Sequence, residues 1–241
     1  MRYGIFSDVH SNGEAFQTVI TSLKEENIDI YICIGDIVGY GAEPSDCIDL
    51  TRKITDKVVA GNHDWASAGI LTTSYFNDFA KEAIEWTSKR LVVEEKEYLK
   101  ALSLVYEDEN ITAVHGSLNE PEEFHYILDT SQALATFGLM KGELCFIGHS
   151  HLPLICAKGR KGVAFLPESE VKIEKGARYI INVGSVGQPR DGDPRASYAV
   201  FDTEKSYAEI KRAPYDVKKA AKKIIDAGLP PVLAARLNEG R

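Results

Sequence analysis

The sequence predicts an α/β protein with parallel strands in its first part and antiparallel strands in its last part. Up to about residue 150, continuous apolar runs alternate with stretches that have helical spacing. Uninterrupted apolar strands joined by helices are typical of parallel strands that are covered on both faces. From Leu154 onward the apolar runs are short, β-prone and separated by Gly-containing turns, which indicates a second, antiparallel sheet packed against the first.

The N-terminal elements follow this alternation in order. The run YGIFSD is the first predicted strand, and residues 14–26 carry Ala15, Val19, Ile20 and Leu23 on one helical face. The apolar run IDIYICIGD is the second strand. A second helix at about residues 45–55 leads to KVVAGNHD, the third run. Ligands bind where the carboxyl ends of such strands meet, so the polar residues after these runs are the candidates for a site.

The middle of the chain is predicted to be mostly helical. Residues 66–105 contain amphipathic stretches at 75–90 and 94–102, and they could cap a site. Strand ITAVH, a loop with Pro121, a short helix at 131–137 and strand LCFIGH follow. The antiparallel part then comprises PLICAKGRKGVAFL, RYIINVG, ASYAVFD and YAEIKRA. Without a linker or an internal repeat, we expect one domain over residues 1–241, with a helical, cap-like insertion at about 66–105.

Composition excludes several classes of protein. A chain of 241 residues with 44% hydrophobic residues can bury one large core, and it has no apolar run of about 18 residues that could cross a membrane. The net charge of -8 argues against non-specific nucleic-acid binding, which requires an excess of Lys and Arg. We expect a cytoplasmic protein of unknown oligomeric state. Its four separated cysteines are expected to be buried, reduced thiols: Cys33, Cys47, Cys145 and Cys156.

Short polar segments end the apolar runs, and they carry most of the histidines. If the runs are strands, their ends bring eight suitable side chains to one sheet edge: Asp8, His10, Asp36, Asn62, His63, His115, His149 and His151. In an extended strand, residues two apart point to the same side. Asp8 with His10, and His149 with His151, would then each present two ligands together.

The donor types and their number predict a centre with two metals. Carboxylate, imidazole and amide donors without thiolate suit Mn, Fe, Co, Ni or Zn. Seven ligands exceed what one ion requires, and Asp36, between the two groups, is the expected bridging carboxylate. Two metals can share a hydroxide that attacks phosphorus, and they can clamp the phosphoryl oxygens. No side-chain nucleophile is then needed, and manganese is the metal expected to support activity.

The ordered blocks DVH, GDIVGYG, GNHD, VHG and GHSH resemble the calcineurin-like metallophosphoesterases, in their small prokaryotic phosphodiesterase-like branch. The resemblance spans about residues 2–202. It implies a four-layer α/β/β/α sandwich, with two mixed sheets flanked by helices. It also implies one metal held by Asp8, His10, Asp36 and His151, and a second held by Asp36, Asn62, His115 and His149. His63 matches the histidine that contacts phosphate and helps to protonate the leaving alkoxide.

The chain departs from the family pattern after Asp36. Phosphoprotein phosphatases of this superfamily carry Asp-Arg-Gly where this chain reads Gly39, Tyr40 and Gly41, so a protein phosphatase or a dinucleoside polyphosphate hydrolase is disfavoured. Arg190, in a Gly- and Pro-rich loop, is the best substitute for the absent phosphate-binding arginine. The alternative for Arg190 is a salt bridge with Asp191 or Asp193. Tyr40 could line the substrate pocket or be a buried structural residue.

The remaining candidates leave alternatives open. His125 matches no block and is expected at the surface or in the cap, and Trp65 is either a core residue or a base-stacking platform. The expected function is hydrolysis of a small phosphodiester or phosphomonoester. The alternative is a non-catalytic protein-interaction scaffold of the same fold, for which degraded ligands would be the mark. Amidohydrolase-type barrels begin with His-x-His, whereas that pair arrives here only at His149, so the order of the residues speaks against a barrel.

Overall fold

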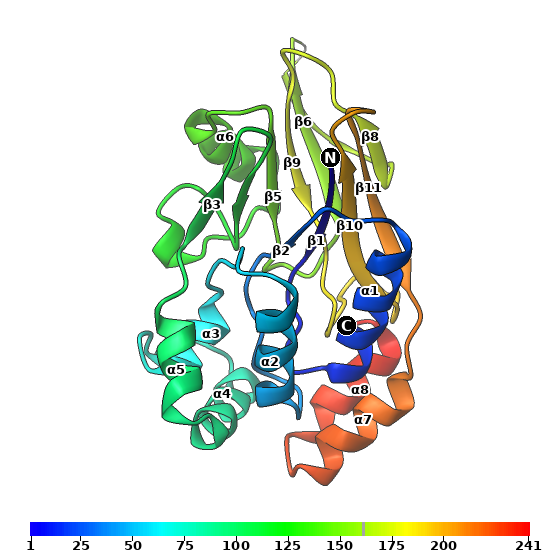
Figure 1. The fold of residues 1–241 in the computed structure, drawn as a ribbon. Helices are drawn as coiled ribbons and strands as arrows, with labels where there is room; N and C mark the ends of the chain where they lie inside the picture. Colours follow the sequence, from blue (N-terminus) through cyan, green and yellow to red (C-terminus); the bar gives the residue numbers. More distant parts are fainter. Residues whose placement is uncertain (161) are drawn as a thin grey trace.

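The computed structural model describes residues 1–160 and 162–241, and it contains two mixed β-sheets (Figure 1). The first sheet has the order β2-β1-β10-β11-β8, and the second has the order β3-β4-β5-β9-β6-β7. The strands of the first sheet are β1 (Arg2–Phe6), β2 (Ile30–Cys33), β8 (Glu170–Lys172), β10 (Ala196–Asp202) and β11 (Tyr207–Ala213). Those of the second are β3 (Val105–Glu107), β4 (Thr112–Val114), β5 (Leu144–Ile147), β6 (Leu154–Gly159), β7 (Gly162–Leu166) and β9 (Arg178–Asn182).

The helices flank the sheets and gather below the lower ends of the strands in Figure 1. Among the helices of the described residues, α6 alone lies beside the upper part of the second sheet. The helices are α1 (Gly13–Glu25), α2 (Pro44–Ile54), α3 (Asn62–Ala68), α4 (Asp78–Arg90), α5 (Val93–Lys100), α6 (Thr130–Leu139), α7 (Val217–Asp226) and α8 (Pro231–Glu239). Two 3-10 turns, Thr73–Tyr75 and Pro121–Glu123, lie in the connecting segments.

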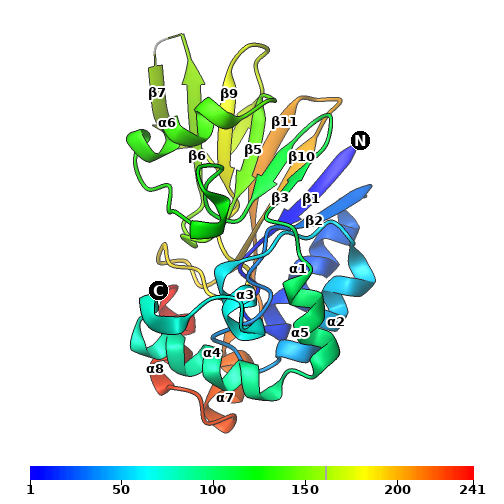
Figure 2. The ribbon, with the colours of Figure 1, turned by 90° about the vertical axis from the view of Figure 1, so that its left-hand side faces the viewer.

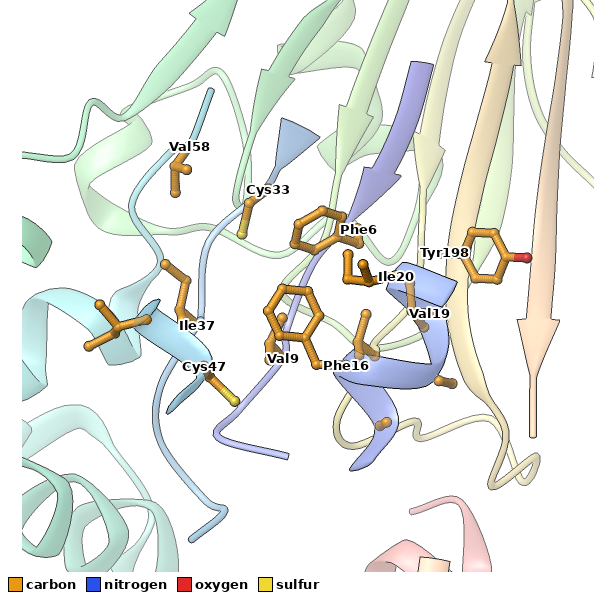
Figure 3. Close-up of a cluster of buried hydrophobic side chains, with 14 of the residues drawn as sticks. Phe6, Val9, Phe16, Val19, Ile20, Cys33, Ile37, Cys47, Val58 and Tyr198 are labelled. Carbon is orange, nitrogen blue, oxygen red and sulfur yellow. The ribbon is translucent and has the colours of Figure 1, made fainter. Parts of the chain in front are cut away.

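Successive side chains of β1 face opposite sides of the first sheet, and this shows how the layers form. Ile5 faces a buried cluster between the two sheets, which also includes Phe146 and Ile181 of the second sheet. Phe6 faces the opposite side, where it contacts the ring of Phe16 on α1 at a centroid distance of 5.2 Å (Figure 3). A third cluster joins the outer face of the second sheet to α6. The four layers of the predicted α/β/β/α sandwich are therefore confirmed.

The division into a parallel first sheet and an antiparallel second sheet is wrong. β1 pairs in parallel with β2 but antiparallel with β10, and the parallel strands β4, β5 and β9 belong to the second sheet, next to antiparallel β6. The run KVVAGNHD does not extend the first sheet, because Val58 and Val59 form only isolated bridges. On the side of β1 opposite to β2, the neighbouring strand is β10, from the C-terminal part of the chain.

The helices agree with the sequence to within a few residues, with one functional exception. The helix expected from residue 66 begins at Asn62, so Asn62 and His63 lie in its first turn. The lysine-rich residues 211–223 form the end of β11 and most of α7, and α8 beyond them was not expected. Lys161, within the run PLICAKGRKGVAFL, lies outside the described residues. No helix in the described part of the chain combines the length and apolarity needed to cross a membrane.

Candidate metal centre

The chain brings seven buried or half-buried histidine, aspartate and asparagine side chains, together with His63, to one end of the two sheets. Asp8 and His10 follow β1, Asp36 follows β2, and His115 follows β4. His149 and His151 follow β5, and Asn62 and His63 begin α3. Three groups have ligand atoms within 4.8 Å of one another: Asp8, His10 and His151; His10, Asp36 and His63; Asp36, His115 and His149. His10 and Asp36 each belong to two groups, so the three groups form one continuous cluster.

Asp8 with His10, and His149 with His151, do converge, but the backbone geometry that brings each pair together is not the predicted one. β1 ends at Phe6 and β5 at Ile147, so neither pair lies on an extended strand. Instead the backbone is left-handed at five cluster residues, with φ of 54° at Asp8, 48° at His10, 53° at Asp36, 67° at His149 and 60° at His151. Such backbone costs about 1–3 kcal/mol per non-Gly residue and concentrates at functional sites. The alternation of side chains along a strand therefore does not explain the pairing.

Three histidines direct the same ring nitrogen at the centre of the cluster. The Nδ1 atoms of His10, His115 and His151 lie 3.1, 2.6 and 2.5 Å from the carbonyl oxygens of Val38, Ile34 and Gln188, respectively. A carbonyl can only accept, so in the neutral rings the proton is on Nδ1 and the Nε2 lone pair faces inward. Yet the Nε2 atoms of His10 and His151 are 3.0 Å apart. Two lone pairs at this distance repel each other unless a cation lies beside them.

Both carboxylates are anchored through one oxygen and present the other to the histidines. Asp36 Oδ1 accepts from the backbone N–H of His63 at 2.8 Å, and Asp8 Oδ2 accepts from that of His149 at 3.0 Å. Asp36 Oδ2 then lies 3.6 Å from His10 Nε2 and 3.3 Å from His115 Nε2. Asp36 is thereby situated between the two histidine groups, which is the position that a bridging carboxylate requires.

The electrostatics of the cluster favour a positive charge at its centre. Burial opposes ionisation of Asp8 and Asp36, but the neighbouring His151 and His115 hold the pKa of each carboxyl below its ordinary value. Burial also lowers the pKa of His63 to about 4 and that of His149 to about 3. At His115 burial is outweighed by Asp36 and Asp8, which raise the pKa to about 9. Two buried carboxylates thus demand a compensating cation.

The donor set fits divalent transition metals. Within the described residues, four buried atoms of the cluster have no hydrogen-bond partner: Asp8 Oδ1, Asn62 Oδ1, His63 Nδ1 and His115 Nε2. Buried polar atoms are rarely left unsatisfied, and each of these can donate an electron pair to a metal. All four cysteines are buried in the hydrophobic clusters and contribute no thiolate. Oxygen and imidazole donors suit Mn, Fe, Co, Ni or Zn.

Asp64 connects the two segments that carry Asp36 and His63, and the sequence reasoning missed it. Its Oδ1 accepts from the N–H of Val38 at 3.2 Å, and its Oδ2 accepts from the N–H of Gly61 at 3.1 Å. Burial and the charge of Asp36 raise the pKa of Asp64 to about 7. Asp64 follows His63 directly in the block GNHD. Its position at the third residue of a helix was the signal for a capping carboxylate.

A cavity of about 570 Å³ opens onto the cluster. Asp36, Asn62, His63, His149 and His151 form its floor, and residues 71–77 and 122–126 contribute to its wall. Phe76 approaches the ring of His63 at 5.1 Å, and Tyr126 stacks on His149 at 4.0 Å with an interplanar angle of 13°. The cap predicted at about residues 66–105 thus contributes to the wall, whereas Phe76 and Tyr126 were not predicted, because the sequence carries no information on which loop side chains face inward.

Arg190 and Tyr40 also line this cavity. The predicted alternative for Arg190, a salt bridge with its neighbours, is wrong: Asp191 pairs with Arg212 and Asp193 with Arg195. Arg190 Nη2 donates instead to Gln188 Oε1 at 2.9 Å and lies 3.4 Å from the hydroxyl of Tyr40. Tyr40 is 4% exposed, so it is both buried and part of the cavity wall.

The two remaining candidates lie outside the cavity wall. His125 is exposed, and its Nε2 lies 3.4 Å from Glu120 Oε2, as expected for a surface residue. Trp65 is half-buried and packs edge-on against Phe124 at 5.6 Å. This contact favours the interpretation of Trp65 as a core residue over a stacking platform.

Comparison with known proteins identifies the family. A model of the calcineurin-like phosphoesterase superfamily domain matches residues 1–206, and the chain belongs to this superfamily. A curated relative, described as an uncharacterized protein of Methanocaldococcus jannaschii, is 38% identical over 242 residues, covering 98% of this chain and 97% of the relative. The family resemblance predicted from the ordered blocks is thereby confirmed.

Solved structures agree with this assignment. The crystal structure of a metallophosphoesterase from Sphaerobacter thermophilus is similar, with a TM-score of 0.88 and 37% identity, covering 100% of this chain and 99% of that one. A hypothetical protein from Pyrococcus horikoshii shares the fold, with a TM-score of 0.80 and 23% identity over 100% of this chain and 98% of its own.

Proposed function

We propose that this protein hydrolyses a small phosphodiester or phosphomonoester with the aid of two divalent transition metals. Asp8, His10, Asp36 and His151 would hold one metal, and Asp36, Asn62, His115 and His149 would hold the other. Membership of a phosphoesterase superfamily and the buried His and Asp cluster support this proposal. Bound metals would lower the pKa of a shared water and neutralise charge on the phosphoryl oxygens.

One observation carries the proposal more than any other. Three histidines donate Nδ1–H to backbone carbonyls, so their Nε2 lone pairs converge on the free oxygens of two buried carboxylates. Histidine ligands of metals are held in this way by hydrogen bonds from the ring nitrogen that does not bind the metal.

His63 is proposed to protonate the leaving group. Its ring lies over Gly39, where a Cβ would come within 2.5 Å of Nδ1, so a glycine is required to leave space for this nitrogen. Tyr40 and Phe76 contact the ring at centroid distances of 4.5 and 5.1 Å and restrict its orientation. His63 lines the cavity, and its buried Nδ1 has no hydrogen-bond partner among the described residues, so no neighbouring acceptor competes for the proton of the ring.

Arg190 is proposed to bind a phosphoryl oxygen. It reaches the segment Gly39–Gly41, where phosphoprotein phosphatases of the superfamily carry their arginine, and its guanidinium faces the cavity beside Tyr40. A guanidinium without a carboxylate partner is suited to bidentate binding of phosphate. Residues 71–77 and 122–126 enclose the cavity from the sides, and we propose that the 66–105 segment acts as a cap of this single-domain protein that restricts access to small substrates.

Metal analysis and hydrolysis assays test the proposal together. Metal-loaded wild-type protein is expected to contain two divalent ions per chain by elemental mass spectrometry. It is also expected to hydrolyse bis-p-nitrophenyl phosphate or p-nitrophenyl phosphate when Mn²⁺ is added. Asp36→Asn removes charge from the position between the two histidine groups, and its activity is expected to fall more than about 100-fold, together with its metal content.

His125→Gln is the matched control, because it changes an exposed histidine outside the cavity wall. Its metal content and activity are expected to equal those of the wild type. A wild-type protein that neither binds metal nor hydrolyses either ester with any of the five metals would overturn the proposal and favour a scaffold.

A further inference from the structure

A second cavity, of about 530 Å³, adjoins the first at the C-terminal helix. The two cavities share Asn77 and Arg190. The remaining wall of the second cavity comes from α8 and the residue after its cap, including Val232, Arg236 and Arg241. In Figure 1 the C-terminus lies next to α8 and close to the yellow loop that carries Arg190. A ligand bound at the metal centre can therefore extend past Arg190 towards α8.

The charge of this second cavity is opposite to that of the whole chain. Three arginines line it in a protein with a net charge of -8: Arg190, Arg236 and Arg241. In the described ranges, neither Arg190 nor Arg236 has a carboxylate within 4.0 Å, whereas Arg241 lies 3.6 Å from Glu239. That last pair is largely exposed, so it binds weakly. With Glu239 counted, the side chains of the cavity wall carry a net charge of about +2.

The position of α8 is fixed by packing rather than by the arginines. Leu233 and Leu237 are buried in a helical cluster that also includes Tyr40 and Ala83 of α4. Gly240 caps α8, and its carbonyl accepts from the N–H of Gly192 at 2.9 Å, which ties the end of the helix to the Arg190 loop. Arg190 and Arg236 line the same cavity, and the charges of both oppose the burial that raises the pKa of Tyr40. The wall is thus assembled before any ligand binds.

We propose that this arginine cavity is a subsite for a second phosphoryl group, so that the substrate is a phosphoester carrying another phosphate remote from the bond that is cleaved. The inference rests on the proposed function of the metal centre. Guanidinium groups match phosphate oxygens in a fork geometry and remain charged at any physiological pH. With Arg190 engaged by the phosphoryl group at the metal centre, an uncharged leaving group would leave the half-buried guanidinium of Arg236 without a partner, and a second phosphate supplies the missing charge.

The subsite is separate from the catalytic part of the chain. The family model matches residues 1–206, which contain every proposed metal ligand and Arg190. Arg236 and Arg241 lie beyond this range, on an element that contributes nothing to the metal cluster. A change in α8 is therefore expected to alter substrate preference without altering the metal centre.

Two substrate pairs test the subsite, because each pair differs only in the remote phosphate. One pair is the diesters pApA and ApA, and the other is 1,3-propanediol bisphosphate, whose two phosphates are equivalent, and 1,3-propanediol monophosphate. Metal-loaded wild-type protein is expected to show kcat/KM about tenfold or more in favour of the doubly phosphorylated member of at least one pair. Arg236→Gln is expected to remove this preference by raising KM, with kcat and metal content unchanged.

Two further variants make the result specific. Arg236→Lys keeps the charge and is expected to retain most of the preference, which a merely structural role would not predict. Arg160→Gln removes one exposed positive charge near the tip of the β6 and β7 strands, at the end of the molecule opposite α8 (Figure 2), and is expected to change nothing.

The outcomes separate the two proposals. Equal kcat/KM for both members of both pairs, or a preference that persists in Arg236→Gln, would overturn the subsite while leaving the phosphoesterase intact. Failure to hydrolyse either pair and both nitrophenyl esters would overturn the proposed function, and the substrate assignment with it.

Discussion

At the residue scale, the centre depends on side chains held in backbone conformations that their residue types rarely adopt. Five of the cluster residues have positive φ, and their hydrogen bonds to neighbouring loops hold them there. This strain fixes the direction of each Cβ before any metal binds. The consequence is that single-atom changes at the centre are expected to alter chemistry more than stability.

His63 gives the first prediction at this scale. His63→Gln removes the proposed proton donor, so hydrolysis of alkyl esters, whose alkoxides are poor leaving groups, is expected to slow by about 10²–10⁴-fold. Hydrolysis of bis-p-nitrophenyl phosphate is expected to slow much less, because nitrophenolate leaves without a proton. Steady-state kcat for the two substrate types, with His125→Gln as control, measures the difference. Equal losses for both types would assign His63 a role in binding only.

The residue types of the site were predictable from the sequence, whereas their geometry was not. Asp8 or His149 could be named because polar residues after buried strands meet at one sheet edge. Their left-handed φ could not be predicted, since only a few per cent of non-Gly residues have positive φ and nothing adjacent in the sequence marks these positions. Asp64, Tyr126 and Phe76 were missed for a related reason: their roles depend on contacts between segments distant in the sequence.

At the element scale, the close approach of the segment after β2 to the start of α3 sets the position of Asp36. Gly61 precedes α3 and has φ of -99°, a backbone that alanine adopts without strain. A Cβ there would nevertheless overlap Asp36 Oδ1 and the Asp36 backbone nitrogen. The glycine is therefore required for space rather than for conformational freedom.

Substitution of Gly61 by alanine tests the requirement for space, because alanine adopts this backbone conformation without strain. Gly61→Ala is expected to displace Asp36 and to lower the metal content and the activity together, measured by elemental mass spectrometry and ester hydrolysis. Gly138→Ala is the matched control, because nothing lies within 4 Å of a Cβ at this position in α6. That variant should keep full metal content and gain up to about 1 kcal/mol in its free energy of unfolding. Normal metal loading in Gly61→Ala would contradict the proposed packing constraint.

The elements themselves were largely predictable, and their pairing was not. Helical periodicity located α1, α2, α4 and α5, because each has one apolar face against the core. Strand periodicity specifies which face is buried but not which strand lies alongside. For that reason β10 was predicted in a separate sheet, whereas its residues Phe201 and Val200 pair with Tyr3 and Gly4 of β1.

At the scale of the whole molecule, the four cysteines lie in two different hydrophobic cores, so their reactivity can be used to follow the unfolding of each core. Cys33 and Cys47 lie in the cluster between the first sheet and its helices, and Cys145 and Cys156 lie in the cluster beneath α6. Burial raises the pKa of Cys145 to about 12 and that of Cys156 to about 11. Because thiolate is the reactive form, native thiols are expected to stay unmodified at pH 8, and unfolded ones to react.

Pulse alkylation in increasing urea then tests whether the chain is one domain. N-ethylmaleimide is expected to label all four cysteines over a single transition, located by peptide mass spectrometry, because the inter-sheet cluster joins both cores. Fully denatured protein supplies the control for complete labelling. Labelling of Cys145 and Cys156 at clearly lower urea than Cys33 and Cys47 would instead divide the chain into two units.

The pairing of β1 with β10 also bears on how the protein is made. Arg2 of β1 aligns with Asp202, and the loop after β9 binds Asp8 through Ser185 Oγ, which donates to the Asp8 carbonyl at 2.8 Å. A nascent chain that has emerged only to residue 180 therefore has an unpaired edge on β1, and its proposed ligands Asp8 and His151 lack their hydrogen-bond partners Ser185 and Gln188. Contacts of such long sequence separation form late, because the intervening chain must first be ordered. Metal capture is thus expected only after the loop that follows β9 and strand β10 have been synthesised and can pack against β1.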